Sequence, residues 1–295
     1  KPIRIVIPYT QGGGTDNLLR IISPTVSANL GQPVIIDNRP GASSMIGSEL
    51  VSKASPDGYT LLATDSAFLI NPGLFKSKLP FDTTQAFTGV SMLASAPVLL
   101  VLHPSVPAKT LPDLIALARA KPGYLNYASG GSGAATHVAG EMLKQITKVF
   151  IVHIPYKGTA PGVIDLIAGR ILLTACAVVS GLDYAKQGKL RALATSGTAR
   201  SQALPEVPTV SESGLKGFSV LDWQGLFTTA KTPAAIVDKI NAETIRILKL
   251  PDVVEKLSIA GCEIQTGTPK QWGDFVKSEI AKWSKVVKEA GVKVE

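Results

Sequence analysis

Near its beginning the chain reads Tyr9-Thr10-Gln11-Gly12-Gly13-Gly14-Thr15-Asp16. The short apolar and β-branched run Ile3–Ile7 comes before this stretch, and Asn17–Leu30 after it has a helical pattern. A strand that turns through glycines into a helix is typical of α/β proteins. The segment therefore predicts an α/β unit whose first helix begins at a glycine turn.

A second segment of the same kind reads Ser129-Gly130-Gly131-Ser132-Gly133-Ala134-Ala135-Thr136-His137, between a predicted strand, Tyr124–Ala128, and a predicted helix, Val138–Ile146. Glycine lets the backbone approach a ligand closely, and a helix N-terminus leaves several N–H donors unpaired. The positive end of the helix dipole adds to these donors, so such a turn favours anions. Two turns so far apart in the sequence predict two lobes that close on one small anion.

The composition is that of a globular protein and not of a nucleic-acid-binding one. Of 295 residues, 45% are apolar and 18% charged, and the net charge of +8 comes from lysines scattered along helix faces, such as Lys277 and Lys288. The chain starts at Lys1 and not at Met, which we interpret as the removal of an export signal. Cys176 and Cys262 lack the spacing of a zinc site, so we expect two free thiols and no metal.

Predicted strands alternate with predicted helices along the whole chain. The strands are expected at Ile3–Ile7, Pro33–Asp37, Thr60–Thr64, Val90–Leu93, Val98–His103, Tyr124–Ala128, Val149–Pro155, Ile171–Ala177, Arg191–Ser196 and within Gly225–Thr229. Thr110-Leu111-Pro112-Asp113 predicts a capping box, Pro24 a kink or a split in the first helix, and Gly291 the end of the last helix.

Proline-marked joints near residues 103–107 and 205–223 divide the chain. We expect a first lobe of residues 1–102 plus 224–295 and an inserted second lobe of residues 103–223. Such a chain crosses between the lobes twice, which predicts a hinge of two strands.

Patterns for cofactors and for catalysis fail. The first turn has Asn17 where a dinucleotide-binding motif requires its third glycine, so no nucleotide cofactor is expected. The second turn resembles a nucleophile elbow around Ser132. However, His137 comes only five residues later, at the start of the helix that follows, so it cannot easily serve as the general base, and no carboxylate is in view to orient it. An enzyme is therefore not expected.

Several motifs occur in an order that resembles a known family. They are Ile7-Pro8-Tyr9 with the first glycine turn, Asp37-Asn38-Arg39-Pro40-Gly41-Ala42, Pro56-Asp57-Gly58-Tyr59-Thr60-Leu61-Leu62, Asn126-Tyr127-Ala128-Ser129, His153-Ile154-Pro155-Tyr156-Lys157-Gly158, Gly188-Lys189-Leu190-Arg191-Ala192-Leu193-Ala194, Leu204-Pro205-Glu206-Val207-Pro208-Thr209 and Glu279–Trp283. This succession resembles the Bug family, the periplasmic solute-binding receptors (TctC-type) of tripartite tricarboxylate transporters.

The resemblance implies an α/β periplasmic binding protein of two lobes (a Venus flytrap, type II-like) with two crossover strands at the hinge. It implies a monomer that captures a small organic carboxylate and delivers it to the membrane permease subunits of the transporter. The ligand-binding residues that it implies are Tyr9, Gly13, Gly14, Thr15, Asp16, Thr64, Ser66, Ala67, Phe68, Ser129, Ser132, Gly133, Ala134, Thr136 and Cys176.

Two departures from the family pattern bear on the ligand. Ser43-Ser44-Met45 stands where the family often has glycines, and the strand that contains Cys176 lacks the usual acidic segment. The resemblance implies that the strand with Cys176 forms one wall of the ligand site. Because this wall is uncharged, it favours a ligand with an apolar or aromatic body, such as a nicotinate- or benzoate-like acid, and a C4–C6 dicarboxylate is the close alternative. A sensing module for a membrane kinase and a hydrolase that uses Ser132 are the competing functions.

Overall fold

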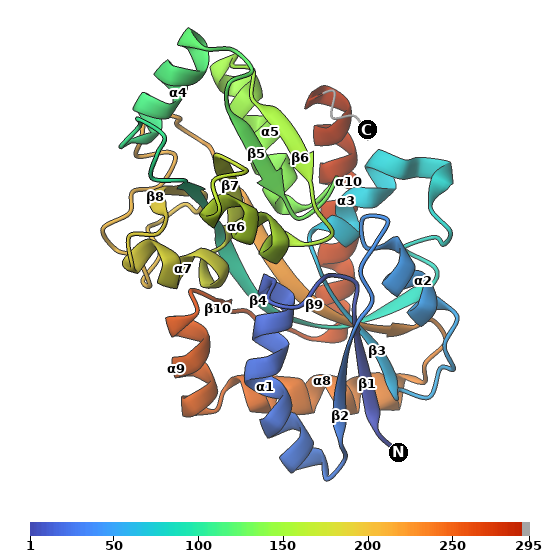
Figure 1. Ribbon diagram of the computed structural model, residues 1–295. Helices are drawn as coiled ribbons and strands as arrows, with labels where there is room; N and C mark the ends of the chain where they lie inside the picture. The colour runs from blue at the N-terminus through green and yellow to red at the C-terminus, as the bar shows by residue number, and fades with distance from the viewer. Residues whose placement is uncertain (291–295) are drawn as a thin grey trace.

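Strands and helices alternate along the chain in the computed structural model, which describes residues 1–290 (Figure 1). The strands are β1 (Ile3–Ile7), β2 (Val34–Asn38), β3 (Thr60–Asp65), β4 (Phe87–Leu102), β5 (Asn126–Ser129), β6 (Val152–Pro155), β7 (Leu173–Ala177), β8 (Arg191–Thr195), β9 (Leu221–Thr229) and β10 (Glu263–Ile264). The helices are α1 (Gly14–Leu30), α2 (Met45–Ser52), α3 (Ala67–Phe75), α4 (Leu111–Ala120), α5 (Ala135–Thr147), α6 (Thr159–Ile167), α7 (Val178–Lys186), α8 (Ala234–Leu248), α9 (Pro251–Ile259) and α10 (Pro269–Ala290), with a 3-10 turn at Lys76–Lys78. The predicted α/β class is confirmed.

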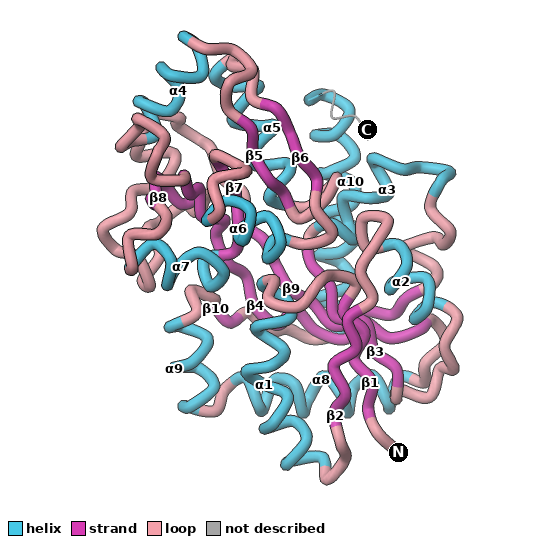
Figure 2. The backbone as a smooth tube through the Cα atoms, viewed as in Figure 1, coloured by secondary structure: helices cyan, strands magenta, loops and turns pink. Residues whose placement is uncertain are grey.

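Two groups of parallel strands lie at the two ends of one sheet path (Figure 2). In the first parallel set, β1 pairs with β2 and β3. In the second parallel set, β5 pairs with β6 and β7. The antiparallel strands β9 and β4 lie between the two sets, in the order β3-β9-β4-β7.

Strand β4 is one long strand where the sequence predicts two. Its residues up to Pro97 pair with β9, and those from Val98 onward pair with β7 and β8. Proline donates no hydrogen bond to a ladder, which is why Pro97 suggests a break. In the structure Pro97 stands at the position where β4 changes partners, and the strand continues through it.

Three further predictions about helices have different outcomes. Helix α1 is continuous through Pro24, so the predicted split is wrong. The capping box at the start of α4 is confirmed, because Thr110 Oγ1 accepts from the Asp113 N–H at 3.2 Å and Asp113 Oδ2 accepts from the Thr110 N–H at 3.0 Å. The predicted end of α10 at Gly291 lies outside the described residues.

The buried core falls into several apolar clusters, and one of them joins α10 to both α3 and α5. One cluster packs α1, α8 and α9 on the first parallel set, and another packs α4 and α5 on the second. Helix α10 lies beside α3 in Figure 1, and its Trp283 and Val287 pack with Ile70 of α3 and Val138 of α5.

The chain passes between the two parts of the sheet at two adjacent places, and Ser196 joins them. One place is the Pro97–Val98 step in β4, and the other is Val220–Leu221 at the start of β9. The Ser196 hydroxyl, fully buried, accepts from the Val98 N–H at 2.7 Å and donates to the Val220 carbonyl. Both lie near the predicted lobe boundaries at 102/103 and 223/224, which stay a prediction.

We predict that Ser196→Ala lowers the melting temperature by several degrees. The change leaves a buried carbonyl without its donor and a buried N–H without an acceptor, at a cost of about 1–3 kcal/mol, and about 1 kcal/mol corresponds to a few degrees in a chain of this size. Ser213→Ala is the control, because the Ser213 hydroxyl donates to the Thr209 carbonyl one turn earlier, a local bond that does not join two strands. Equal melting temperatures for the two variants in differential scanning calorimetry would contradict the role of Ser196.

Candidate ligand-binding cavity

Four helices begin at one small cavity that lies between the two parallel sets. The cavity is lined by Tyr9, Gly13, Gly14, Thr15, Asp16, Asp65, Gly130, Ala134, Ala135, Thr136, Gly158, Thr159, Ala177 and Asp222. Among these are the N-cap residues of α1 (Gly13), α5 (Ala134), α6 (Gly158) and α7 (Ala177).

None of these four N-caps makes a side-chain capping bond within the described residues. Thr110 of α4, by contrast, caps its own helix. Glycine and alanine have no side-chain acceptor for the first N–H groups of a helix, so these donors are left for another acceptor. The positive ends of four helix dipoles also converge here, and the arrangement suits an anion.

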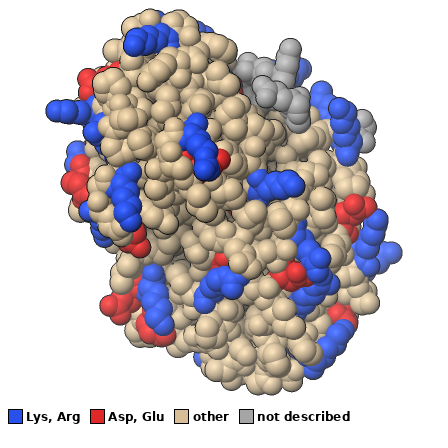
Figure 3. All heavy atoms as spheres, in the orientation of Figure 1, with Lys and Arg blue, Asp and Glu red and all other residues tan. Residues whose placement is uncertain are grey.

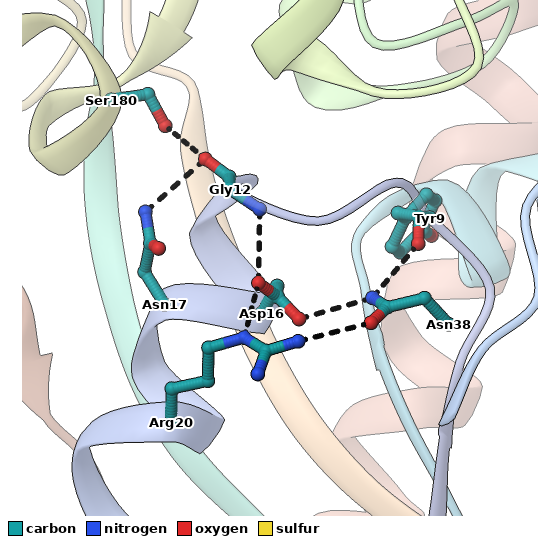
Figure 4. A network of polar contacts seen from close by, with 7 residues as sticks. All are labelled: Tyr9, Gly12, Asp16, Asn17, Arg20, Asn38 and Ser180. Carbon is teal, nitrogen blue, oxygen red and sulfur yellow. Dashed lines mark hydrogen bonds and ion pairs between the residues drawn. The ribbon is translucent and has the colours of Figure 1, made fainter. Parts of the chain in front are cut away.

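The first glycine turn is held by a network centred on Asp16 (Figure 4). Asp16 Oδ2 accepts from the Gly12 N–H at 2.9 Å and from Arg20 Nε at 2.8 Å, and its Oδ1 accepts from Asn38 Nδ2 at 3.0 Å. Burial by itself would raise the pKa of Asp16, but the hydrogen bonds from Arg20, Gly12 and Asn38 lower it below its usual value. Asp16 is therefore an ionised residue whose described partners already satisfy it, and it shapes the turn.

The second glycine turn is held by side chains of its own helix and strand. The Gly130 N–H donates to Thr136 Oγ1 at 2.9 Å, the Gly133 N–H donates to His137 Nδ1 at 3.0 Å, and Gly131 and Gly133 have φ angles of 124° and 85°. Such positive φ angles favour glycine. The turn residues are therefore needed for its shape.

Two of the four helix starts were not predicted as part of the site. Gly158 and Thr159 begin α6, and Ala177 precedes α7. The segment that ends in Tyr156-Lys157-Gly158 was used only as one of the motifs that carry the family resemblance. The overlooked signal is the glycine at 158 between the strand ending in Pro155 and a helical pattern, whereas nothing in the sequence marks Ala177.

Contacts across the cavity hold it nearly closed. The Thr10 N–H donates to the Lys157 carbonyl at 3.3 Å, and Ser180 Oγ donates to the Gly12 carbonyl at 3.2 Å (Figure 4). The enclosed volume is 30 Å³, which is room for about two water molecules. A small organic acid occupies more space than this volume.

Two aspartates, Asp65 and Asp222, line the other side of the cavity, and neither was among the predicted ligand-binding residues. Tyr9 Oη donates to Asp65 Oδ1 at 2.6 Å, and Gln224 Nε2 donates to Asp222 Oδ2 at 3.3 Å. Burial raises the pKa of Asp65 to about 6. Burial and then the charge of Asp65 raise the pKa of Asp222 well above its usual value. The two carboxyl groups therefore share a site that opposes full ionisation of both.

The serines and histidines near the second turn do not form a catalytic triad in the described part of the chain. His153 Nε2 is hydrogen-bonded to Ser129 Oγ at 2.7 Å, and the rings of His137 and His153 stack at 4.2 Å. Burial lowers the pKa of His137 to about 4 and that of His153 to about 3, so both rings are neutral at pH 7. No side-chain hydrogen bond links Ser132 to either ring within residues 1–290.

The predicted ligand-binding residues divide into two groups. Those that line the cavity are Tyr9, Gly13, Gly14, Thr15, Asp16, Ala134 and Thr136. Those that lie elsewhere are Thr64, Ser66, Ala67, Phe68, Ser129, Ser132, Gly133 and Cys176.

Several members of the second group are placed by the core. Phe68 packs with Phe81, Phe87 and Phe227, and Cys176 is fully buried in an apolar cluster. The expectation that a wall at Cys176 selects the ligand therefore has no support from this structure. Cys176 and Cys262 are both free thiols, as expected.

Two features of the molecule concern nucleic-acid binding and membrane insertion: the distribution of surface charge and the apolar character of the helices. Lys and Arg side chains are dispersed over the face seen in Figure 3, with acidic side chains among them. Within residues 1–290, no helix combines the length and the apolar character that a membrane span requires.

Solved structures show which class of protein this fold defines. It is similar over the whole chain to the periplasmic binding protein BugD, with 30% identity, a TM-score of 0.95 and coverage of 100% of this chain and 99% of that one. It is also similar to Rpa4515 of R. palustris with adipate (33% identity, TM-score 0.96, coverage 100% and 98%). A third match is MatC of Rhodopseudomonas palustris with bound malate (32%, 0.91, 97% and 98%). The fold is that of a periplasmic binding protein.

The family follows from the sequence. The family described as "Tripartite tricarboxylate transporter family receptor" (TctC) matches residues 18–292. The chain belongs to this family, and the resemblance to Bug receptors is confirmed.

We predict that Gly158→Ala weakens ligand binding about fivefold to a hundredfold by obstructing closure. A Cβ at this position would lie 2.3 Å from Thr10 Oγ1 on the opposite side of the cavity. Strain of about 1–3 kcal/mol in the closed form corresponds to a loss in this range, since about 1.4 kcal/mol is tenfold. Isothermal titration with whichever carboxylate binds measures the change.

Gly188→Ala is the matched control for this prediction. Gly188 also has a positive φ, of 70°, but a Cβ there has no neighbour within 4 Å. Unchanged affinity in Gly158→Ala, or an equal loss in Gly188→Ala, would show that the approach of Gly158 to Thr10 does not matter for binding.

We also predict that His137→Gln makes the protein less sensitive to acid. The unfolded chain binds a proton at His137 below about pH 6.5, whereas the folded protein does so only near pH 4. Stability is therefore lost as the pH falls between these values, by on the order of 3 kcal/mol for this residue. Urea unfolding at pH 7 and pH 4.5 should show a smaller loss in the variant than in the native protein; equal losses would mean that His137 is not held neutral.

Proposed function

We propose that this protein is an extracytoplasmic receptor that binds a small carboxylate in the cavity and delivers it to the permease of a tripartite tricarboxylate transporter. The observation that carries the proposal is the convergence of four uncapped helix N-termini on one cavity. A carboxylate supplies the acceptors that these N–H groups lack, and the helix dipoles favour its charge. The adipate and malate bound by two solved relatives support this class of ligand.

The proposed mode of action is closure of two lobes on the ligand. In this proposal the lobes are residues 1–102 with the segment from 224 onward, and residues 103–223. The two chain crossings next to Ser196 form the hinge. The bonds from Thr10 to Lys157 and from Ser180 to Gly12 form on closure. Ligand and closure then stabilise each other, because the ligand binds the closed arrangement of turns better than the open one.

The absence of basic side chains from the described cavity lining suits a receptor that must also release its cargo. Among residues 1–290, no Lys or Arg lines the cavity. Release of the carboxylate into the permease therefore breaks hydrogen bonds to backbone groups, and no buried ion pair between that carboxylate and a basic side chain, which would be costly to separate, has to be broken. We infer that the permease has only to reopen the cavity to free the ligand.

Catalysis has no support in this geometry, and we propose a binding protein and not an enzyme. Ser132 lacks a base, and the neutral His153 has no carboxylate to orient it within the described residues. We also propose a periplasmic location and a monomer, in keeping with the family and with BugD. No observation favours a sensory role over transport.

A panel of organic acids tests the proposal. We predict that at least one small carboxylate raises the melting temperature by several degrees at millimolar concentration, because a ligand that binds only the folded state stabilises it by mass action. The corresponding primary amide, which has the same shape but no charge, should have little effect. If no acid in a broad panel shifts the transition, or if each amide acts as well as its acid, the carboxylate site is refuted.

A further inference from the structure

The cavity has two chemically different sides. The four helix N-termini offer N–H donors, whereas the strands β3 and β9 bring acceptors. Asp65 pairs with Gln224 in the antiparallel β3–β9 ladder, and Asp222 lies two residues before Gln224. Side chains directly opposite, or two residues apart on one strand, project from the same face of a sheet. Asp65, Gln224 and Asp222 therefore form one group of acceptors on that face.

Asp65 and Asp222, the acid pair, accept hydrogen bonds only from neutral groups within residues 1–290. Asp65 receives hydrogen bonds from the Tyr9 hydroxyl and the Ala67 N–H, and Asp222 from the Ser66 N–H and the Gln224 amide. Within residues 1–290 neither aspartate forms an ion pair, unlike Asp16, which pairs with Arg20 at 2.8 Å. Carboxylates that are removed from water without an opposite charge are costly to keep ionised, in agreement with the raised pKa values of both groups.

Two buried oxygens at the first glycine turn also lack a partner in the described part of the chain. Gln224 is 1% exposed and its Oε1 has no hydrogen bond, and Thr15, which lines the cavity, is 3% exposed and its Oγ1 has none. The Gln224 amide nitrogen lies 3.7 Å from the point where a Cβ on Gly14 would be. The Gln224 side chain thus lies next to both the first glycine turn and Asp222, and Thr15 belongs to that turn.

Building on the proposed function, we propose that the ligand is a small zwitterion, with its carboxylate at the helix N-termini and an ammonium group between Asp65 and Asp222. An ammonium has three N–H donors and no acceptor, which matches two carboxyl groups without a described cation and the unpartnered Gln224 oxygen beside them. It supplies the positive charge that the described protein does not place there, through charge-assisted hydrogen bonds. A dicarboxylate would instead bring a second negative charge to the acid pair.

Matched sets of acids with one carbon skeleton test this assignment. The sets are adipate, hexanoate and 6-aminohexanoate, and succinate, butanoate and 4-aminobutanoate, measured with the native protein by isothermal titration at pH 7.5. In at least one set the amino acid should bind tenfold or more tightly than both the diacid and the plain monoacid. A diacid or monoacid that binds as tightly as its amino counterpart in both sets would overturn the zwitterion and leave the carboxylate receptor intact.

Variants that remove one negative charge each provide a second, independent test of the ammonium site. Asp65→Asn and Asp222→Asn should each weaken binding of the amino acid tenfold or more, and should leave binding of the monoacid unchanged or stronger. Asp183→Asn removes an equal charge from an exposed position on α7 and should change neither. Equal loss for all ligands, or no loss for the amino acid, would overturn the role of the pair.

The two proposals fail in different ways. If no ligand of either set, and no other carboxylate, binds the native protein, the carboxylate receptor itself fails and the zwitterion with it. If an Asn variant does not fold, as judged by circular dichroism, the comparison of ligands on the native protein still decides the question.

Discussion

Strand β4 is the constraint on which the arrangement of the molecule depends, because it is hydrogen-bonded to strands of both parts of the sheet. Through β9 it is linked to the first parallel set, and through β7 to the second. Helix α1 follows the carboxyl end of β1 in the first parallel set, and α5, α6 and α7 follow the carboxyl ends of β5, β6 and β7 in the second. Ligands of α/β proteins bind at such strand ends. The shared strand brings these ends together at one cavity.

Once the helix starts face each other, their uncapped N–H groups give the cavity its chemistry. The residues at the four N-caps are small, so the backbone itself forms the donor side. The acceptor side comes from β3 and β9, where Asp65 and Asp222 are kept close together at a cost in stability. Proteins accept such local costs at sites where function requires them, and the pair is thus a feature that we ascribe to the ligand.

The sequence predicts the local parts of this site better than the parts that depend on strand register. The two glycine turns are recognisable because strand, glycines and helix are consecutive in the chain. Asp65 was not predicted, although its neighbours Thr64 and Ser66 were. Its place at the cavity depends on the pairing of β3 with β9, which the sequence does not reveal. Asp222 lies in the chain far from either turn, and only the same ladder brings it to the cavity. Phe68 was predicted at the site from the family resemblance, and in the structure it packs into the aromatic core.

The fold shows the same division. Strand and helix alternation predicts the class, and the capping box predicts the start of α4, because both are local properties. The continuity of β4 through Pro97 and of α1 through Pro24 depends on tertiary packing, which overrides the preference of proline for a break.

A structure of the complex with a bound carboxylate would test the central claim most directly. The account predicts that the carboxylate oxygens lie within hydrogen-bonding distance, about 2.7–3.2 Å, of backbone nitrogens from the first turns of at least two of α1, α5, α6 and α7. A carboxylate held instead by lysine or arginine side chains, or bound outside the cavity, would contradict it.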